Sequence, residues 1–235
     1  MLNEASDGRG QRGPSPNETI TRIVVRPLAS ALPLGFFAFA IGTTLLATVE
    51  LKWIPKSESL AVVIVLLGYV APLEFIPCIF GFLSRDTGAA TTMGIFSMGW
   101  VVLGLNFLMF GTAAKSTTLG IFMILDSLAI FSLSFASMSA KPLMGVILSL
   151  SAVRFLLAAV IQLGGGTAVS IAAGAVGLLT GVLALYGGLA LLLEDTRQKS
   201  VLPVLRRRAA EQSLEGTLHD QLARLEKEAG VRQQL

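Results

Sequence analysis

Long apolar segments, separated by short polar breaks, run from Pro27 to Leu193. A helix that crosses a bilayer needs about 20 predominantly apolar residues, and each segment has that length. The breaks carry the charges and turn formers that end helices. They read ELKWIPKSES, SRDTG, GTAAKS, SAKP and GGG. The pattern therefore predicts an all-α integral membrane protein with six transmembrane helices per protomer, over about residues 28–49, 59–83, 89–111, 117–138, 142–163 and 167–193.

The two ends of the chain differ from this apolar middle. Residues 1–26 are polar and rich in Gly, Pro, Ser and Asn, which predicts a disordered cytoplasmic N-terminus. Residues 27–193 form the predicted transport domain, and residues 194–235 form a charged, helix-prone cytoplasmic tail. Leucines recur along the tail at helical spacing, at Leu214, Leu218, Leu222 and Leu225. This narrow stripe fits either a helix resting on the bundle or lipid surface, or a helix that pairs with copies of itself.

Composition agrees with a membrane location and excludes several chemistries. The chain is 53% hydrophobic and 14% charged, with a mean hydropathy of +0.73, whereas soluble domains are about a quarter charged. Cys78 and His219 are the single cysteine and the single histidine. They cannot supply a disulfide, a Cys/His zinc site or a Cys–His nucleophile pair within one chain. We expect no metal, no cofactor and no catalytic triad, and therefore no enzyme.

The positive charge of the chain reports its topology. The formal net charge is +3, but the basic residues lie mostly at the ends and in one class of loop, so we expect no nucleic-acid partner. With the N-terminus inside, the inner segments hold Arg9, Arg12, Arg22, Arg26, Arg85, Lys141 and the basic tail. The outer loops hold Lys52, Lys56 and Lys115. This asymmetry predicts a multi-pass protein of the cell membrane with both termini in the cytoplasm.

Three ionisable residues lie inside predicted spans, where charges are costly and face a pore, a cavity or a partner. Glu74 is flanked by prolines and is either a proton carrier or gate, or a structural partner of Arg154. Arg154 follows Ser151 by one helical turn, so a hydroxyl and a guanidinium share one face that would attract an anion. Asp126 is a second proton or gating candidate, and it is also the other possible counter-ion for Arg154.

The final span resembles the closing signature of the acetate uptake transporter family, also called the succinate–acetate permeases. The matching positions are Gly174, Gly177, Gly181, Ala184, Tyr186 and the Val201-Leu202-Pro203 that follows the span. The first span keeps Pro33, Leu34 and Gly35 of the family's opening motif, and Tyr69 and Trp100 match aromatic positions of the second and third spans. Without the resemblance, glycines in the last span would be assigned to close helix packing.

The resemblance implies a six-helix protomer in a homo-hexamer, with a path in each protomer for acetate or succinate together with protons. In the family an aromatic–aromatic–leucine constriction narrows that path. Its counterparts here are Phe39, Phe96 and Ser151. The serine departs from the family leucine, and Arg154 stands where the family is apolar.

These departures lead us to expect faster or less selective anion passage than in a typical relative, because a serine and an arginine should widen and charge an apolar neck. Two alternatives remain. One is a channel for small neutral amides or urea, against which Arg154 argues. The other is a membrane sensor or scaffold without transport activity.

Overall fold

A computed structural model describes residues 28–197 and 199–207. In this part of the chain, six helical segments are long and apolar enough to cross a membrane, as the sequence predicts. They are α2 (Leu32–Glu50), the segment Ser59–Leu83, α5 (Thr87–Phe110), α6 (Thr117–Met138), α7 (Pro142–Gln162) and α8 (Thr167–Arg197). The predicted N-terminal segment lies outside the described residues, as does the leucine stripe of the tail.

The helix ends follow from local chemistry. Asp86 caps α5 by accepting a hydrogen bond from the Ala89 amide at 3.2 Å, and Ser116 caps α6 by accepting one from the Leu119 amide at 3.2 Å. Helix α7 begins at a proline, whose missing amide hydrogen costs nothing at the first helical position. Helix α8 continues to Arg197, four residues past the predicted end of the last span.

The second span is divided by a change of helical type. Its parts are a short 3-10 turn η1 (Lys56–Glu58), α3 (Ser59–Val65), a π-helical turn η2 (Leu66–Val70) and α4 (Ala71–Leu83). Pro72 has no amide hydrogen, and its ring would clash with the carbonyl of Gly68 in a regular α-helix. The wider π turn lies directly before this proline, where it relieves that conflict.

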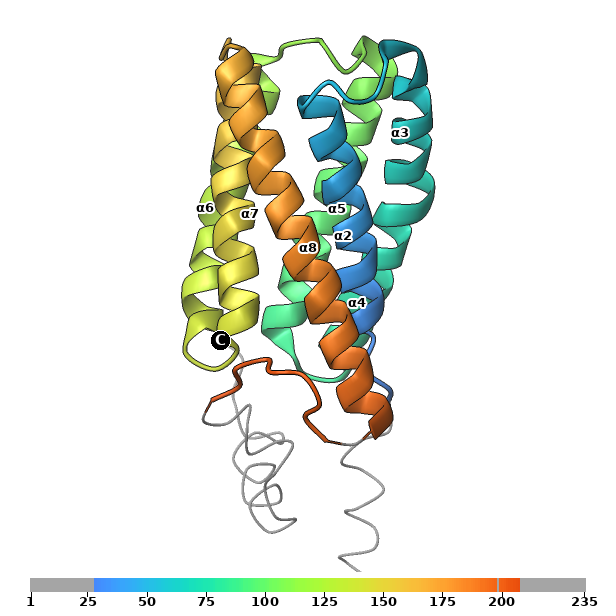
Figure 1. The fold of residues 1–235 in the computed structure, drawn as a ribbon, viewed down its shortest axis with the longest axis vertical. Helices are drawn as coiled ribbons and strands as arrows, with labels where there is room; N and C mark the ends of the chain where they lie inside the picture. The colour runs from blue at the N-terminus through green and yellow to red at the C-terminus, as the bar shows by residue number, and fades with distance from the viewer. Residues whose placement is uncertain (1–27, 198, 208–235) are drawn as a thin grey trace, which may run out of the picture. The chain divides into compact units, whose positions relative to one another are not determined.

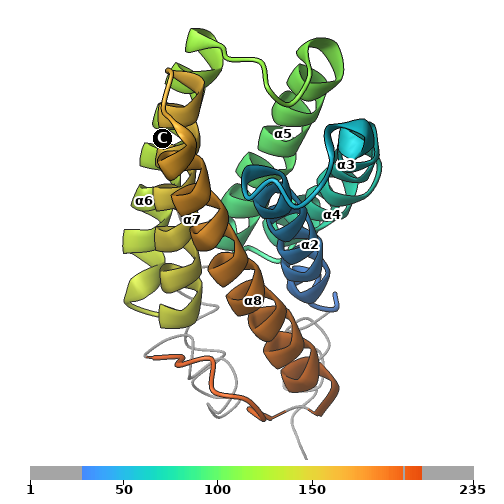
Figure 2. The same ribbon diagram turned by 45° about the horizontal axis from the view of Figure 1, so that its top comes forward.

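The helices pack in neighbouring pairs. α2 runs antiparallel beside α8, α4 lies against α5, and α6 packs along α7, with α7 also contacting α8 (Figures 1 and 2). Signature glycines allow the α2–α8 approach: a Cβ at Gly174 would lie 3.1 Å from the Ala47 carbonyl oxygen. Small residues promote such contacts between membrane helices.

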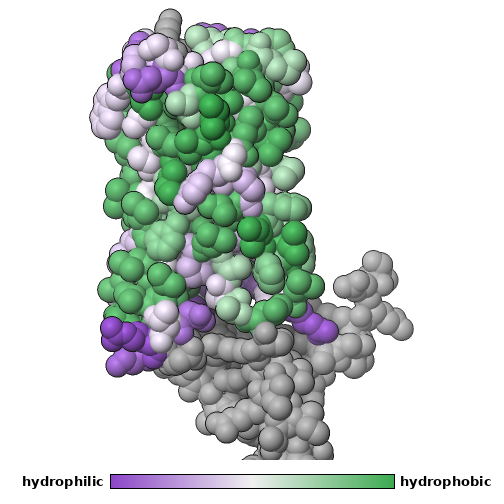
Figure 3. All heavy atoms as spheres, turned by 90° about the vertical axis from the view of Figure 1, so that its right-hand side faces the viewer, coloured by the Kyte–Doolittle hydropathy of each residue, from purple (hydrophilic) through white to green (hydrophobic). Residues whose placement is uncertain are grey.

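The outer surface is apolar over most of its height, with polar groups gathered near the two ends in the face that Figure 3 shows. Large exposed apolar side chains include Phe75, Ile79 and Phe82 of α4 and Phe131 and Phe135 of α6. A monomer in water rarely exposes an apolar surface of this extent, whereas the acyl chains of a bilayer would cover it favourably. The protein is a multi-pass membrane protein.

Candidate functional site

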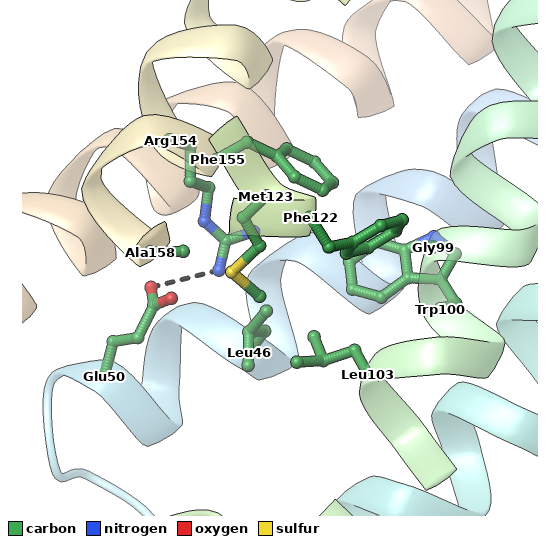
Figure 4. A pocket seen from close by; sticks show the side chains of 10 residues that line it. All are labelled: Leu46, Glu50, Gly99, Trp100, Leu103, Phe122, Met123, Arg154, Phe155 and Ala158. Atoms are coloured by element: carbon green, nitrogen blue, oxygen red, sulfur yellow. Dashed lines mark hydrogen bonds and ion pairs between the residues drawn. The ribbon is translucent and has the colours of Figure 1, made fainter. Parts of the chain in front are cut away.

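A pocket lies between four helices, in the half of the bundle where α2 ends. It holds about 410 Å³ of empty space, including its open side. Its lining comes from α2 (Leu46, Glu50), α5 (Gly99, Trp100, Leu103), α6 (Phe122, Met123) and α7 (Arg154, Phe155, Ala158) (Figure 4). Apolar side chains form most of this wall, so the two charged ones, Glu50 and Arg154, dominate its chemistry.

Arg154 reaches from α7 to two residues of α2. Its Nη2 donates to Glu50 Oε2 at 3.0 Å, and its Nη1 donates to the Thr43 hydroxyl. The arginine and glutamate side chains are 6% and 10% exposed, so this ion pair is largely withdrawn from solvent. Within the described residues, Arg154 Nε has no hydrogen-bond partner. The guanidinium group therefore keeps one unused donor, Nε, which lies close to Gly177 of α8.

Helix α8 leaves room for this guanidinium. A Cβ at Gly177 would lie 2.7 Å from Arg154 Nε and 2.9 Å from the Ala47 Cβ. No real Cβ approaches other heavy atoms so closely, so the glycine serves both the helix contact and the arginine. The position assigned to the family signature thus also shapes the site.

An aromatic stack adjoins the pocket on the side toward the start of α2. The rings of Phe39 and Phe96 stack with centroids 4.5 Å apart, and Phe96 stacks on Phe155 at 6.2 Å. Trp100 lies 6.4 Å from Phe39 in a tilted arrangement. Phe155 and Trp100 also line the pocket, so the two predicted aromatic residues are joined to it through these neighbours.

Ser151 and Arg154 have different surroundings at this pocket. Ser151 is buried, and its hydroxyl donates to the Ile147 carbonyl of its own helix at 2.8 Å. Arg154 lines the pocket, whereas Ser151 is not part of the pocket wall. In this pocket the guanidinium therefore takes part without the hydroxyl, and the expectation that both groups line one substrate path stays a prediction.

Glu74 is fully buried between α4 and α5. Its Oε1 accepts a hydrogen bond from Trp100 Nε1 at 2.8 Å, while Oε2 has no partner among the described residues. The nearby Ser97 hydroxyl donates instead to the Ala71 carbonyl at 2.8 Å. Trp100 thus touches both the acid and the pocket, which connects Glu74 to the site through one indole ring.

Asp126 lies behind the wall that Gly99 contributes. A Cβ at Gly99 would lie 3.7 Å from Asp126 Oδ2, and that oxygen has no hydrogen-bond partner within the described part of the chain. The partner of Arg154 is Glu50, rather than Glu74 or Asp126 as the sequence suggested. Glu50 was overlooked because it ends a span, where charges are ordinary. Glu50 and Arg154 are far apart along the chain, so no local sequence pattern indicates that they form a pair.

The remaining family-motif positions have structural contacts. Tyr186 donates from its hydroxyl to the Pro203 carbonyl at 3.0 Å, and a Cβ at Gly35 would meet the sulfur of Met93. Pro33 stands in the first turn of α2. Leu34 and Tyr69 are exposed on the outer surface.

The opposite end of the bundle carries a set of ionic contacts, which we call the loop-end network. It comprises Asp86, Lys141, Glu194 and Arg206. Lys141 binds Asp86 at 2.5 Å, Arg206 binds Glu194, and the amide of Arg207 donates to the Ala140 carbonyl at 3.0 Å. Figure 1 shows the segment after α8 turning back beneath α6 and α7.

The charge of Asp86 is stabilised within this network. Burial alone would raise the pKa of its carboxyl. Lys141, the Ala89 amide and the nearby charge of Arg206 outweigh burial and hold that pKa below its ordinary value of 3.8.

Comparison with known proteins places the chain in a family. The profile of the GPR1/FUN34/yaaH family matches residues 13–206. No curated protein sequence matches the chain. A solved structure described as the bacterial acetate channel SatP aligns with a TM-score of 0.67 at 21% sequence identity, covering 75% of this chain and 99% of that chain, which supports the fold. Because the family profile spans most of the chain and all six helices, this protein belongs to the GPR1/FUN34/yaaH family, the acetate uptake transporter family that its sequence resembles.

Proposed function

We propose that this protein is a channel or transporter for small monocarboxylates, with acetate as the first candidate and succinate as the second. The observation that carries the proposal is a buried arginine in a pocket between membrane helices whose wall, apart from this arginine and its partner Glu50, is mostly apolar. A guanidinium recognises a carboxylate, and an apolar wall accommodates a short alkyl group. Family membership and the acetate channel among the structural matches support the same substrate class.

The proposed path runs through each protomer, from the pocket along the aromatic stack. Phe39, Phe96 and Ser151 would line its narrow part, and Arg154 would lie at its wider end. About 16 Å of helix rise separates Phe39 from Glu50 along α2, so the arginine site and the stack would act on a substrate in succession. A homo-hexamer in the cell membrane, with both termini cytoplasmic, is the proposed assembly.

Uptake of labelled acetate into vesicles containing the purified full chain tests the proposal. Arg154→Leu should lower uptake, whereas Arg197→Leu, at an exposed arginine near the end of α8, should not. Excess acetamide or urea should not compete, because a neutral amide offers no charge to the guanidinium. Absence of uptake of every monocarboxylate by the wild type would contradict the proposed function, and equal uptake by both leucine variants would contradict the role of Arg154.

Proton linkage is assigned to Glu74. One of its oxygens is held by Trp100 and the other has no partner, so the second oxygen is available to carry a proton. Glu74→Gln keeps an oxygen for the Trp100 hydrogen bond and removes the titration. We expect this variant to transport acetate with a weakened response to a pH gradient, and Glu58→Gln, at an exposed acid, to respond as the wild type does. An unchanged response in Glu74→Gln would make Glu74 a structural residue.

A further inference from the structure

The pocket already contains a carboxylate, that of Glu50. Among the residues that line the cavity, Glu50 is the single acid and Arg154 the single base, and their side chains meet at 3.0 Å (Figure 4). The rest of the wall is apolar apart from the Trp100 indole, whose N–H is taken by Glu74. For any small carboxylate that entered the cavity, the most favourable partner would be Arg154, and Arg154 already binds the carboxylate of Glu50.

The contact between Glu50 and Arg154 is one that another carboxylate could replace. Glu50 is bound through one oxygen to one guanidinium nitrogen, whereas arginine and carboxylate groups form their strongest contacts through two parallel hydrogen bonds. Thr43 holds the other terminal nitrogen. The guanidinium is therefore kept in place by α2 even when its link to Glu50 is broken.

Release of Glu50 requires only a side-chain movement. Glu50 is the last residue of α2, and its backbone carbonyl accepts a hydrogen bond from the Ser170 hydroxyl at 2.7 Å. This contact ties the end of α2 to α8 whatever the carboxylate does. Rotation of the glutamate side chain would free the arginine without moving a helix.

We propose that the carboxylate of Glu50 occupies the anion position beside Arg154, and that a small carboxylate binds there by displacing it. This inference rests on the proposed function and deepens it, since it identifies the binding position and an internal competitor. If about one molecule in ten has a free guanidinium, the apparent affinity for substrate is about tenfold below that of an unoccupied site. Glu50 thereby sets the affinity of the pathway.

The displacement can be tested without a transport assay, by asking whether added acetate restores the stability that is lost when the Glu50 carboxylate is removed. Glu50→Ala removes the carboxylate and leaves a gap beside Arg154. Sodium acetate should then raise the melting temperature of the detergent-purified full chain more than sodium chloride does at equal ionic strength. The rise should be much smaller in the wild type and in Glu58→Ala, and absent from the double variant Glu50→Ala with Arg154→Gln.

Vesicle uptake supplies the second measurement. Glu50→Gln should lower the half-saturating acetate concentration by up to about tenfold, while Glu58→Gln leaves it unchanged. Equal acetate stabilisation of Glu50→Ala and wild type would overturn the inference, even in vesicles that transport acetate. Rescue of Glu50→Ala in a protein that transports no acid would instead support the displaced carboxylate and reject the proposed function.

Discussion

Gly177 determines, at the scale of a single residue, whether Arg154 can lie where it does. Its missing side chain leaves the space that the guanidinium occupies between α7, α8 and α2. Because membrane interiors are closely packed, an added methyl group must displace the arginine or push α8 away from α2.

Gly177→Ala should therefore lower the free energy of unfolding by about 1–3 kcal/mol, the usual cost of overpacking. The Gly177→Ala substitution should also weaken acetate binding, because the guanidinium of Arg154 is the group nearest to the new methyl. Thermal unfolding in detergent and the half-saturating acetate concentration measure the two effects.

Gly68→Ala provides the matched control. A Cβ at Gly68 meets nothing within 4 Å, so the same chemical change should leave both quantities near their wild-type values. Equal destabilisation by the two substitutions would show that the Gly177 contact is not as tight as its geometry indicates.

The sequence identifies individual charges more readily than their partners. Arg154, Glu74 and Asp126 stand out because they interrupt apolar spans, and all three are buried. The contacts from Glu74 to Trp100 and from Arg154 to Glu50 depend on how helices face one another, which a single sequence does not encode locally. Phe155 was missed for another reason: one more aromatic residue in an apolar span carries no distinctive signal.

At the scale of elements, the boundaries of the six spans follow closely from turn formers and caps, since these act within a few residues. The π turn at Leu66–Val70 was not predicted, because both helix types have similar hydrophobic patterns over so short a stretch. The extension of α8 to Arg197 was also missed. The charged residues of its last turn resemble those of the tail in sequence, although one of them, Glu194, is buried against Arg206 in the structure.

The contact between the start of α5 and the start of α7 should respond to acid. Asp86→Asn keeps a good helix cap but removes the charge that faces Lys141. Because the folded state lowers the pKa of Asp86, the stability due to its charge is fully present above about pH 5 and is lost as pH falls through the folded-state pKa, below 3.8. The melting temperatures of wild type and Asp86→Asn should differ at neutral pH and converge in acid; a constant difference would assign the effect to something other than this charge.

The segment after α8 should be held mainly by Arg206. Arg206→Gln leaves the buried Glu194 without its cation and should cost about 1–3 kcal/mol of stability. Arg207→Gln removes the neighbouring charge, but its contact to Ala140 uses the backbone and should persist. Limited proteolysis after α8 should accelerate in the first variant alone, and similar rates in both would contradict the specific role of the ion pair.

At the scale of the whole molecule, the six candidate spans of the described residues would place the start of α2 and the end of α8 on the same side of a membrane. In a background with Cys78→Ser, Ser57→Cys should react with a membrane-impermeant thiol reagent from outside intact cells, and Ser139→Cys only after the membrane is opened. Ser57 lies in the 3-10 turn η1 and Ser139 between α6 and α7, in connections at opposite ends of the bundle. The distribution of Lys and Arg predicts which end is cytoplasmic. The reverse labelling pattern would invert the proposed orientation.

The position of Trp100 also gives the molecule an optical probe of its own. The chain has two tryptophans, Trp53 exposed in a loop and Trp100 buried between Glu74 and the pocket. Replacing Trp53 by phenylalanine would leave a single emitter whose indole N–H touches the buried acid and whose ring faces the cavity. Its fluorescence wavelength and quenching would then report occupancy of the pocket and rearrangement at Glu74 without any attached label.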